Sequence, residues 1–269
     1  MPSEWALPAL KAAYENREAI SAGWRKVLDR LRGPQNRIAF VGPGGVGKTV
    51  LLDHLTGRAF AKGYEPPGTS RKAERGAARA AGNRLAITVA PGQYGQKIDA
   101  FNDAFAPERP VDGVVFVTAH GFTTVLDQTA MKSNIEEGYD SIEKWRGLQF
   151  REDRQYLELV LNLMASAHRK SGKPQWMLVA VSKCDLFQSE IEAAEKYYSP
   201  YFHSPFSDIL RKFRNDVGRN YFEWNAAPVC AWLEAFEWGQ ERVAPGLDLA
   251  ARNHYLAKMT QRMGELCRA

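Results

Sequence analysis

Residues 42–49 form a glycine-rich stretch of the kind that binds phosphate groups. They read Gly-Pro-Gly-Gly-Val-Gly-Lys-Thr, a full match to G-x-x-x-x-G-K-[ST]. Glycines let the backbone turn with its N–H groups pointing inward around phosphate oxygens, and a helix starting near Lys48 adds the positive end of its dipole. We expect the Lys48 ammonium to reach the β and γ phosphates and the Thr49 hydroxyl to bind Mg²⁺. The predicted phosphate site comprises Gly42, Gly44, Gly45, Val46, Gly47, Lys48, Thr49 and Val50.

The segments on either side of this stretch follow the order that the motif requires. Residues 37–41 are a short apolar run typical of a strand, and Val50, Leu51, Leu52 and Leu55 recur at helical spacing. The alternative is an ordinary glycine turn, which this strand–loop–helix context disfavours.

A second motif follows another apolar run, at residues 177–181. It reads Ser182-Lys183-Cys184-Asp185. A carboxylate at the tip of a parallel strand can accept two hydrogen bonds from N1–H and the N2 amino group of guanine, whereas adenine offers no such donor pair. Asp185 therefore favours guanine, and Lys183 would lay its stem along the purine face. The alternative is a strand-end turn with a capping lysine.

With these two motifs the chain resembles the Ras-like GTPases of the translation-factor-related class, whose base-reading motif is Asn/Thr-Lys-x-Asp. The resemblance covers roughly residues 37–269 and implies GTP or GDP as the bound nucleotide with Mg²⁺ as cofactor. Ser182 stands where Asn is more common, which shortens the contact that Asn makes to the phosphate loop and the base.

The resemblance also assigns weaker motifs. Thr69 corresponds to the first switch threonine, whose hydroxyl would join Mg²⁺ and whose N–H would meet the γ-phosphate only in the triphosphate state. A solvated turn threonine is the alternative. Residues 228–232 offer a last strand, in which the backbone around Ala231, with Cys230 and Trp232, would meet the guanine carbonyl.

One part of the family pattern is altered. Residues 90–93 read Ala-Pro-Gly-Gln, in which Gly92 corresponds to the residue that contacts the γ-phosphate and Gln93 to the glutamine that orients the attacking water. Val89, however, occupies the position of the aspartate that supports Mg²⁺. Loss of an outer metal partner typically reduces affinity or activity about 10–100-fold. No replacement carboxylate is evident in the sequence, because Asp112 precedes the next strand and belongs to the wrong end of the sheet.

The arrangement of apolar runs predicts the fold class. Residues 114–118 and 177–181 are continuous apolar runs, typical of strands covered by helices on both faces. Residues 72–80 and 84–89, on either side of Gly82-Asn83, are consistent with a hairpin. Strands that alternate with helices predict an α/β fold with a doubly wound, mostly parallel sheet of P-loop NTPase topology.

The same pattern predicts the domain organisation. Residues 4–32 have helical periodicity, so 1–34 is expected to be an N-terminal amphipathic extension and 35–269 a Ras-like GTPase domain. Residues 127–150 are polar, helix-prone and longer than a crossover requires, and are interpreted as a helical insertion. Apolar residues between 249 and 266 predict a closing helix.

Composition restricts the class of protein. With 45% hydrophobic and 25% charged residues the chain is typical of globular proteins. Its three cysteines lack the spacing of a metal site or a disulfide framework. No window of 18 apolar residues occurs, and acidic and basic residues are distributed throughout the first thirty residues. We therefore expect a cytoplasmic protein without a transmembrane segment.

The net charge of +5 is too small to indicate a nucleic-acid partner. Residues 58–84 hold seven bases and two acids, an excess as large as that of the whole chain. For this basic segment the alternatives are a solvated surface, an acidic partner surface and extra phosphate contacts. For the aromatic residues between 197 and 224 they are core packing and a partner surface. An effector or assembly partner would contact the N-terminal helix, the basic hairpin 71–84 or the insertion 127–150.

Two functions from different classes are compatible with these motifs. The first is a GTP-binding switch that hydrolyses GTP slowly, with Lys48, Gln93 and Thr69 in catalytic roles. The second is an assembly or regulatory module that binds nucleotide with little or no hydrolysis. An ATPase or kinase that uses the same phosphate loop is a third possibility.

Overall fold

The computed structural model describes residues 36–68, 73–80, 82–91, 105 and 110–268. The predicted helix at 4–32 lies outside these residues, as do Thr69, Gly92 and Gln93. Contacts divide the chain into two units, Met1–Gln35 and Asn36–Ala269, and the described residues all belong to the second. The assignment of residues 1–34 to an N-terminal extension and of 35–269 to a GTPase domain stays a prediction.

The centre of this unit is a six-stranded sheet with the strand order β2-β3-β1-β4-β5-β6. Every neighbouring pair is parallel except β2 and β3, which form the predicted hairpin. The α/β class with a doubly wound, mostly parallel sheet is therefore confirmed. The strands are β1 (Asn36–Val41), β2 (Glu74–Ala80), β3 (Asn83–Val89), β4 (Gly113–Thr118), β5 (Trp176–Val181) and β6 (Glu223–Pro228).

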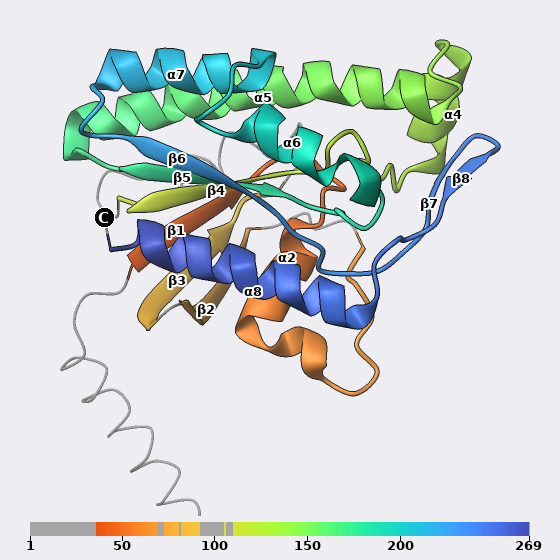
Figure 1. The fold of residues 1–269 in the computed structure, drawn as a ribbon, viewed down its shortest axis with the longest axis horizontal. Helices are drawn as coiled ribbons and strands as arrows, with labels where there is room; N and C mark the ends of the chain where they lie inside the picture. Colours follow the sequence, from red (N-terminus) through yellow and green to blue (C-terminus); the bar gives the residue numbers. More distant parts are fainter. Residues whose placement is uncertain (1–35, 69–72, 81, 92–104, 106–109, 269) are drawn as a thin grey trace, which may run out of the picture. The chain divides into compact units, whose positions relative to one another are not determined.

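Helices cover both faces of the sheet (Figure 1). One face carries α2 (Lys48–Thr56) and α8 (Leu249–Leu266), and the other α5 (Ile142–Ser171), α6 (Ile191–Tyr198) and α7 (Pro205–Val217). This double covering explains why every residue of β4 and β5 is buried. Within the described ranges, no helix combines the length and apolar character needed to cross a membrane.

Residues 127–150, interpreted as an insertion, contain α4 (Gln128–Glu136) and the first two turns of α5. Asp127 caps α4 by accepting hydrogen bonds from two backbone N–H groups, and the Ser141 hydroxyl caps α5 by accepting one from the Lys144 N–H. The segment is therefore helical, and part of it is continuous with the helix that crosses back over the sheet.

The last strand of the six-stranded sheet lies earlier in the sequence than predicted. The last strand is residues 223–228, so the prediction of a strand at 228–232 is wrong. Pro228 is the last residue to pair with β5, opposite Val181, and the chain then leaves the sheet. Proline has no N–H with which to continue a ladder, which makes it a natural end point.

Beyond this loop lies a short hairpin that the sequence analysis did not identify, β7 (Phe236–Trp238) and β8 (Glu241–Val243). Trp238 stacks on Trp145 of α5 with ring centroids 3.9 Å apart, and its indole N–H donates to the Tyr139 carbonyl at 2.6 Å. The hairpin thus packs against the α4–α5 region, near which it lies in Figure 1.

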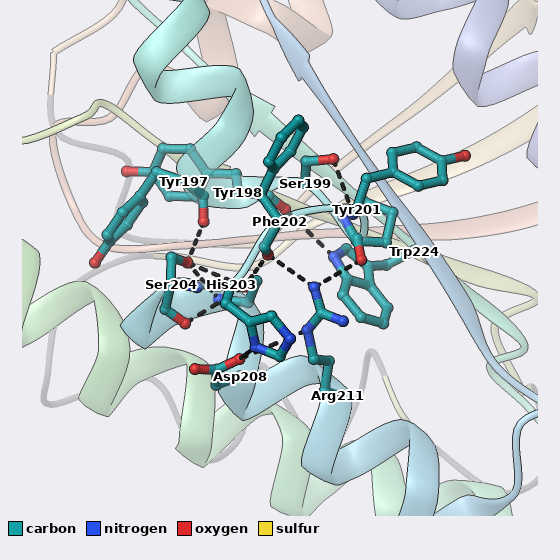
Figure 2. Close-up of polar contacts among 12 residues, drawn as sticks. Tyr197, Tyr198, Ser199, Tyr201, Phe202, His203, Ser204, Asp208, Arg211 and Trp224 are labelled. Atoms are coloured by element: carbon teal, nitrogen blue, oxygen red, sulfur yellow. Dashed lines mark hydrogen bonds and ion pairs between the residues drawn. The ribbon is translucent and has the colours of Figure 1, made fainter.

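The aromatic residues around the α6–α7 connection, several of which are drawn in Figure 2, divide between core and surface. Tyr198 and Trp224 are buried, and the Trp224 indole donates to the Tyr198 carbonyl at 3.3 Å. Phe202 is exposed, and Arg211 donates to the carbonyls of Pro200 and Phe202 at 2.8 Å each. Core packing therefore accounts for the first pair, and Arg211 holds the connecting loop.

A buried acid on α5 gives the fold a pH-dependent element. The Thr118 hydroxyl donates to Asp153 at 2.5 Å, and burial raises the pKa of Asp153 to about 7. The folded chain therefore keeps a proton that the unfolded chain releases near the ordinary value of 3.8. The stabilisation from this retained proton is complete below pH 3.8 and declines as the pH rises to about 7. Above about pH 7 both states have lost the proton, and stability no longer depends on this group.

We expect Asp153→Asn to remove this dependence, because the amide stays neutral at every pH. Urea unfolding of both proteins at about pH 5 and about pH 8 should show the variant gaining stability relative to wild type at the higher pH. An identical difference between the two proteins at both pH values would contradict the raised pKa.

Candidate nucleotide site

The topology places the candidate site at the carboxyl end of β1. From β1 the chain passes through α2 and β2 to β3 on one side of β1, and from β3 it crosses to β4 on the other side. This change of direction opens a crevice at the strand ends. A cavity of about 790 Å³ lies there. The predicted site residues that line it are Gly44, Gly45, Val46, Gly47, Lys48, Thr49, Val50, Ser182, Lys183, Asp185, Ala231 and Trp232. Gly42 and Cys230 are adjacent in sequence to this lining but are not part of it.

The phosphate loop needs its glycines. Gly45 has a φ of +74°, and a Cβ there would lie 1.9 Å from the Thr124 carbonyl oxygen. At Gly42 a Cβ would lie 2.1 Å from the Val117 carbonyl oxygen. Gly47 caps α2 without a side-chain hydrogen bond, so no side chain of its own occupies the anion-binding end of that helix.

Lys48 already lies within this loop. Its side chain is buried, and its ammonium donates to the Gly42 carbonyl at 2.8 Å and the Pro43 carbonyl at 2.6 Å. An ammonium has three donors and no acceptor, so it can exchange a neutral carbonyl for a charged phosphate oxygen and gain a stronger bond.

Asp185 is a buried carboxylate in the cavity lining. Only 2% of the residue is exposed, and neither carboxylate oxygen has a hydrogen-bond partner among the described residues. Burial raises the pKa of Asp185, and the nearby Cys230 thiol offsets this in part. A buried acceptor without a donor is destabilising by roughly 1–3 kcal/mol, and more when charged. A ligand with two adjacent N–H donors would satisfy this carboxylate.

Lys183 connects the base-reading motif to the loop after β4. Its backbone has a φ of +57°, a strained conformation for a residue with a side chain. The ammonium donates to the Phe122 carbonyl at 2.8 Å and the Thr124 hydroxyl at 2.5 Å, and burial lowers its pKa to about 8. Since Thr124 also contacts Gly45, this lysine ties the two motifs together.

Ser182 makes the same connection from the other side. Its hydroxyl lies 2.7 Å from the Val46 carbonyl and 3.0 Å from the Thr118 carbonyl. A hydroxyl has one proton and so donates to one of these at a time. The serine therefore reaches the phosphate loop although it is shorter than the asparagine of the family motif.

The loop after β6 completes the cavity. The Val229 carbonyl accepts from the Cys184 N–H at 3.2 Å, which holds this loop beside the base-reading motif. Trp232 meets Tyr64 edge to face at 5.9 Å, and the Tyr64 hydroxyl donates to Asp53 on α2 at 2.8 Å. Ala231, whose backbone is predicted to contact the guanine carbonyl, thus lies in a loop that is held at both ends and not in a strand.

Thr49 has a carboxylate partner that sequence reasoning missed. Its hydroxyl donates to Oε1 of Glu74, the first residue of β2, at 2.9 Å. The sequence analysis identified no carboxylate that could replace the one missing at Val89, and the structure places that of Glu74 beside Thr49. Asp112, in contrast, accepts from the Arg37 N–H at 2.7 Å and pairs with Lys173 at the opposite end of the sheet, as expected.

These residues fit a magnesium ion held jointly with phosphate. Within the described part of the chain, no group of three or more His, Cys, Asp or Glu residues could hold a metal alone. Magnesium usually takes few protein ligands and completes its shell with water and substrate phosphates. The Thr49 hydroxyl beside the Glu74 carboxylate suits that mode, whereas Thr69, the other predicted ligand, lies outside the described residues.

Helix α5 also contributes to the cavity in a way that the motifs did not indicate. Trp145, Gln149, Glu152 and Tyr156 line it. They lie on one helical face at steps of three or four residues, a pattern equally typical of core packing. Only the tertiary arrangement shows which of these residues reach the cavity.

The fold is that of a P-loop protein, and the buried Asp185 lies in the same cavity as the glycine-rich loop. Residues 37–168 match the family described as 50S ribosome-binding GTPase. The match identifies a P-loop GTPase domain that includes residues 37–168. The structure of the mammalian SRP receptor is similar, with 17% identity and a TM-score of 0.43 over 83% of this chain and 100% of that chain. No curated protein matches the sequence.

Proposed function

We propose that this protein binds GTP and GDP in the cavity at the end of β1, hydrolyses GTP slowly to GDP and phosphate, and acts as a switch. The observation that carries this proposal is Asp185, a buried carboxylate without a hydrogen-bond partner among the described residues, in the same cavity as the phosphate loop. Guanine supplies the two donors that this group needs, and adenine does not.

In the proposed mechanism Lys48 and the backbone amides of residues 44–49 hold the β and γ phosphates, while Asp185 holds the base. Gln93 orients a water molecule for in-line attack, with Gly92 donating its N–H to the γ-phosphate. Thr49 and Thr69 would hold Mg²⁺, which when bound neutralises charge on the β- and γ-phosphate oxygens.

Hydrolysis is expected to be slow because Val89 itself cannot support the metal, so that any carboxylate support must come from a neighbouring strand. It is buried and apolar, with 2% of its surface exposed. This residue also favours the second candidate function, an assembly or regulatory module that binds nucleotide and scarcely turns it over.

Switching would depend on the segment that contains Thr69. Residues 66–68, just before it, line the cavity, and Tyr64 anchors the preceding loop to α2. A γ-phosphate contact at Thr69 would then order the segment, and hydrolysis would release it. In a cytoplasmic setting, the proposed effector or assembly surfaces are the N-terminal helix, the basic hairpin 71–84 and residues 127–150.

Single-turnover assays with radiolabelled GTP test this proposal. We expect wild type to release phosphate slowly and Gln93→Leu to release it about a hundredfold more slowly, because the attacking water loses its orienting group. Tight GTP binding without phosphate release would instead establish the non-hydrolysing module. Equal competition by ATP and GTP would contradict the assignment of guanine.

A further inference from the structure

The register of the β2–β3 hairpin brings a carboxylate to the position where the family pattern lacks one. Val89, which stands in place of the metal-supporting aspartate, pairs directly with Glu74 of the antiparallel neighbour. Directly opposed residues of an antiparallel pair have their Cβ atoms about 4.5–5.5 Å apart on the same face of the sheet. Glu74 therefore offers a carboxylate on the strand next to the one from which the aspartate is missing. Because glutamate is one methylene longer than aspartate, its carboxylate can extend farther from its own strand.

The chemistry of Thr49 fits this assignment. A hydroxyl has one proton and two lone pairs, so Thr49 can donate to Glu74 while a lone pair remains for a metal ion. The observed bond of 2.9 Å directs the proton to the carboxylate. It thus orients the threonine oxygen and raises its electron density, as outer partners of metal ligands commonly do.

The packing of β2 on α2 holds Glu74 in place. Gly76 shares the face of Glu74, and a Cβ there would lie 2.8 Å from Thr56 and 2.9 Å from Leu52 of α2. The missing side chain allows the strand to approach the helix that begins with Lys48 and Thr49. The contact between Glu74 and Thr49 therefore follows from close strand–helix packing.

From this geometry we propose that Glu74 replaces the absent aspartate at position 89 as the carboxylate of the magnesium site. It holds the Thr49 hydroxyl in its binding orientation and supplies the negative charge that Val89 lacks. This inference rests on the proposed function, because it needs a guanine nucleotide in the cavity.

The test is the Mg²⁺ dependence of nucleotide retention. Dissociation of mant-GDP is measured by fluorescence over a Mg²⁺ titration and again in EDTA. We expect Glu74→Gln to need about 10–100-fold more Mg²⁺ than wild type for the same retention, with a dissociation rate in EDTA within about twofold of wild type. Glu65→Gln, which removes the same charge from an exposed position just before the cavity lining, should behave as wild type.

Two further variants keep the proposal falsifiable. Glu74→Asp, which retains the charge, should need less Mg²⁺ than Glu74→Gln. Adding Val89→Asp to Glu74→Ala should recover part of the metal response. Unchanged Mg²⁺ dependence in Glu74→Gln would overturn the assignment, as would equally faster dissociation with Mg²⁺ and in EDTA, which marks a purely structural role. Failure of wild type to bind mant-GDP under either condition would overturn the proposed function itself.

Discussion

Lys48→Ala is expected to abolish detectable GTP hydrolysis and to weaken nucleotide binding by about 10–100-fold or more. A charge-assisted hydrogen bond contributes roughly 1.5–3 kcal/mol, and each 1.4 kcal/mol corresponds to a tenfold change in affinity. The effect on hydrolysis should be larger still, because charge that develops on the phosphate oxygens loses the Lys48 ammonium. In the structure this ammonium is already buried in the loop, bound to two loop carbonyls.

Isothermal titration with GDP and single-turnover phosphate release measure the two effects separately. Lys62→Ala is the matched control, since Lys62 is exposed in the loop that follows α2. Wild-type hydrolysis by Lys48→Ala would show that phosphate is bound elsewhere. Loss of binding in both variants would point to general destabilisation.

Asp185→Asn is expected to reduce the affinity for GDP by about a hundredfold and to shift preference toward xanthosine diphosphate. An amide can accept from only one of the two guanine donors, and its NH₂ group then faces the guanine amino group. Xanthine carries a carbonyl at that position, which the amide can satisfy. Sites built around such hydrogen bonds discriminate strongly, because a mismatched ligand leaves buried groups unpaired.

The same substitution should leave the nucleotide-free protein at least as stable as wild type. The raised pKa of Asp185 shows that burial disfavours its charged form, so a neutral isostere removes an unfavourable contribution. Titration with GDP and xanthosine diphosphate, alongside melting without nucleotide, measures both effects. Asp216→Asn, an exposed change on α7, serves as control. Unchanged GDP affinity in Asp185→Asn would remove the basis for guanine recognition.

Much of the fold can be predicted from the sequence because its signals are local. Buried strands such as 114–118 are continuous apolar runs, and the phosphate loop has a fixed spacing between a strand and a helix. The position of the last strand is harder to predict because residues 226–232 are apolar on both sides of Pro228, so hydrophobicity alone does not show where pairing ends. The β7–β8 hairpin escapes prediction because strands of three residues are too short to show a period.

The candidate site divides in the same way. The glycines of the phosphate loop and Asp185 belong to motifs that are contiguous in sequence. Glu74, in contrast, lies on the other strand of the β2–β3 hairpin, fifteen residues before Val89. The cross-strand neighbour of Glu74 could have been deduced from the register of the hairpin, since pairing of Ala80 with Asn83 places Glu74 opposite Val89. The cavity-lining residues of α5 depend on helix packing, which no local pattern encodes.

Thermal melting of the protein with Mg²⁺ and either GDP or ADP tests most directly whether the cavity at the end of β1 selects guanine. A nucleotide at a hundred times its dissociation constant should stabilise the folded protein by about 2.7 kcal/mol. We predict a clear upward shift of the melting temperature with GDP and a much smaller one with ADP at the same concentration. Equal shifts with the two nucleotides, or no shift with either, would contradict the assignment of a guanine-selective site.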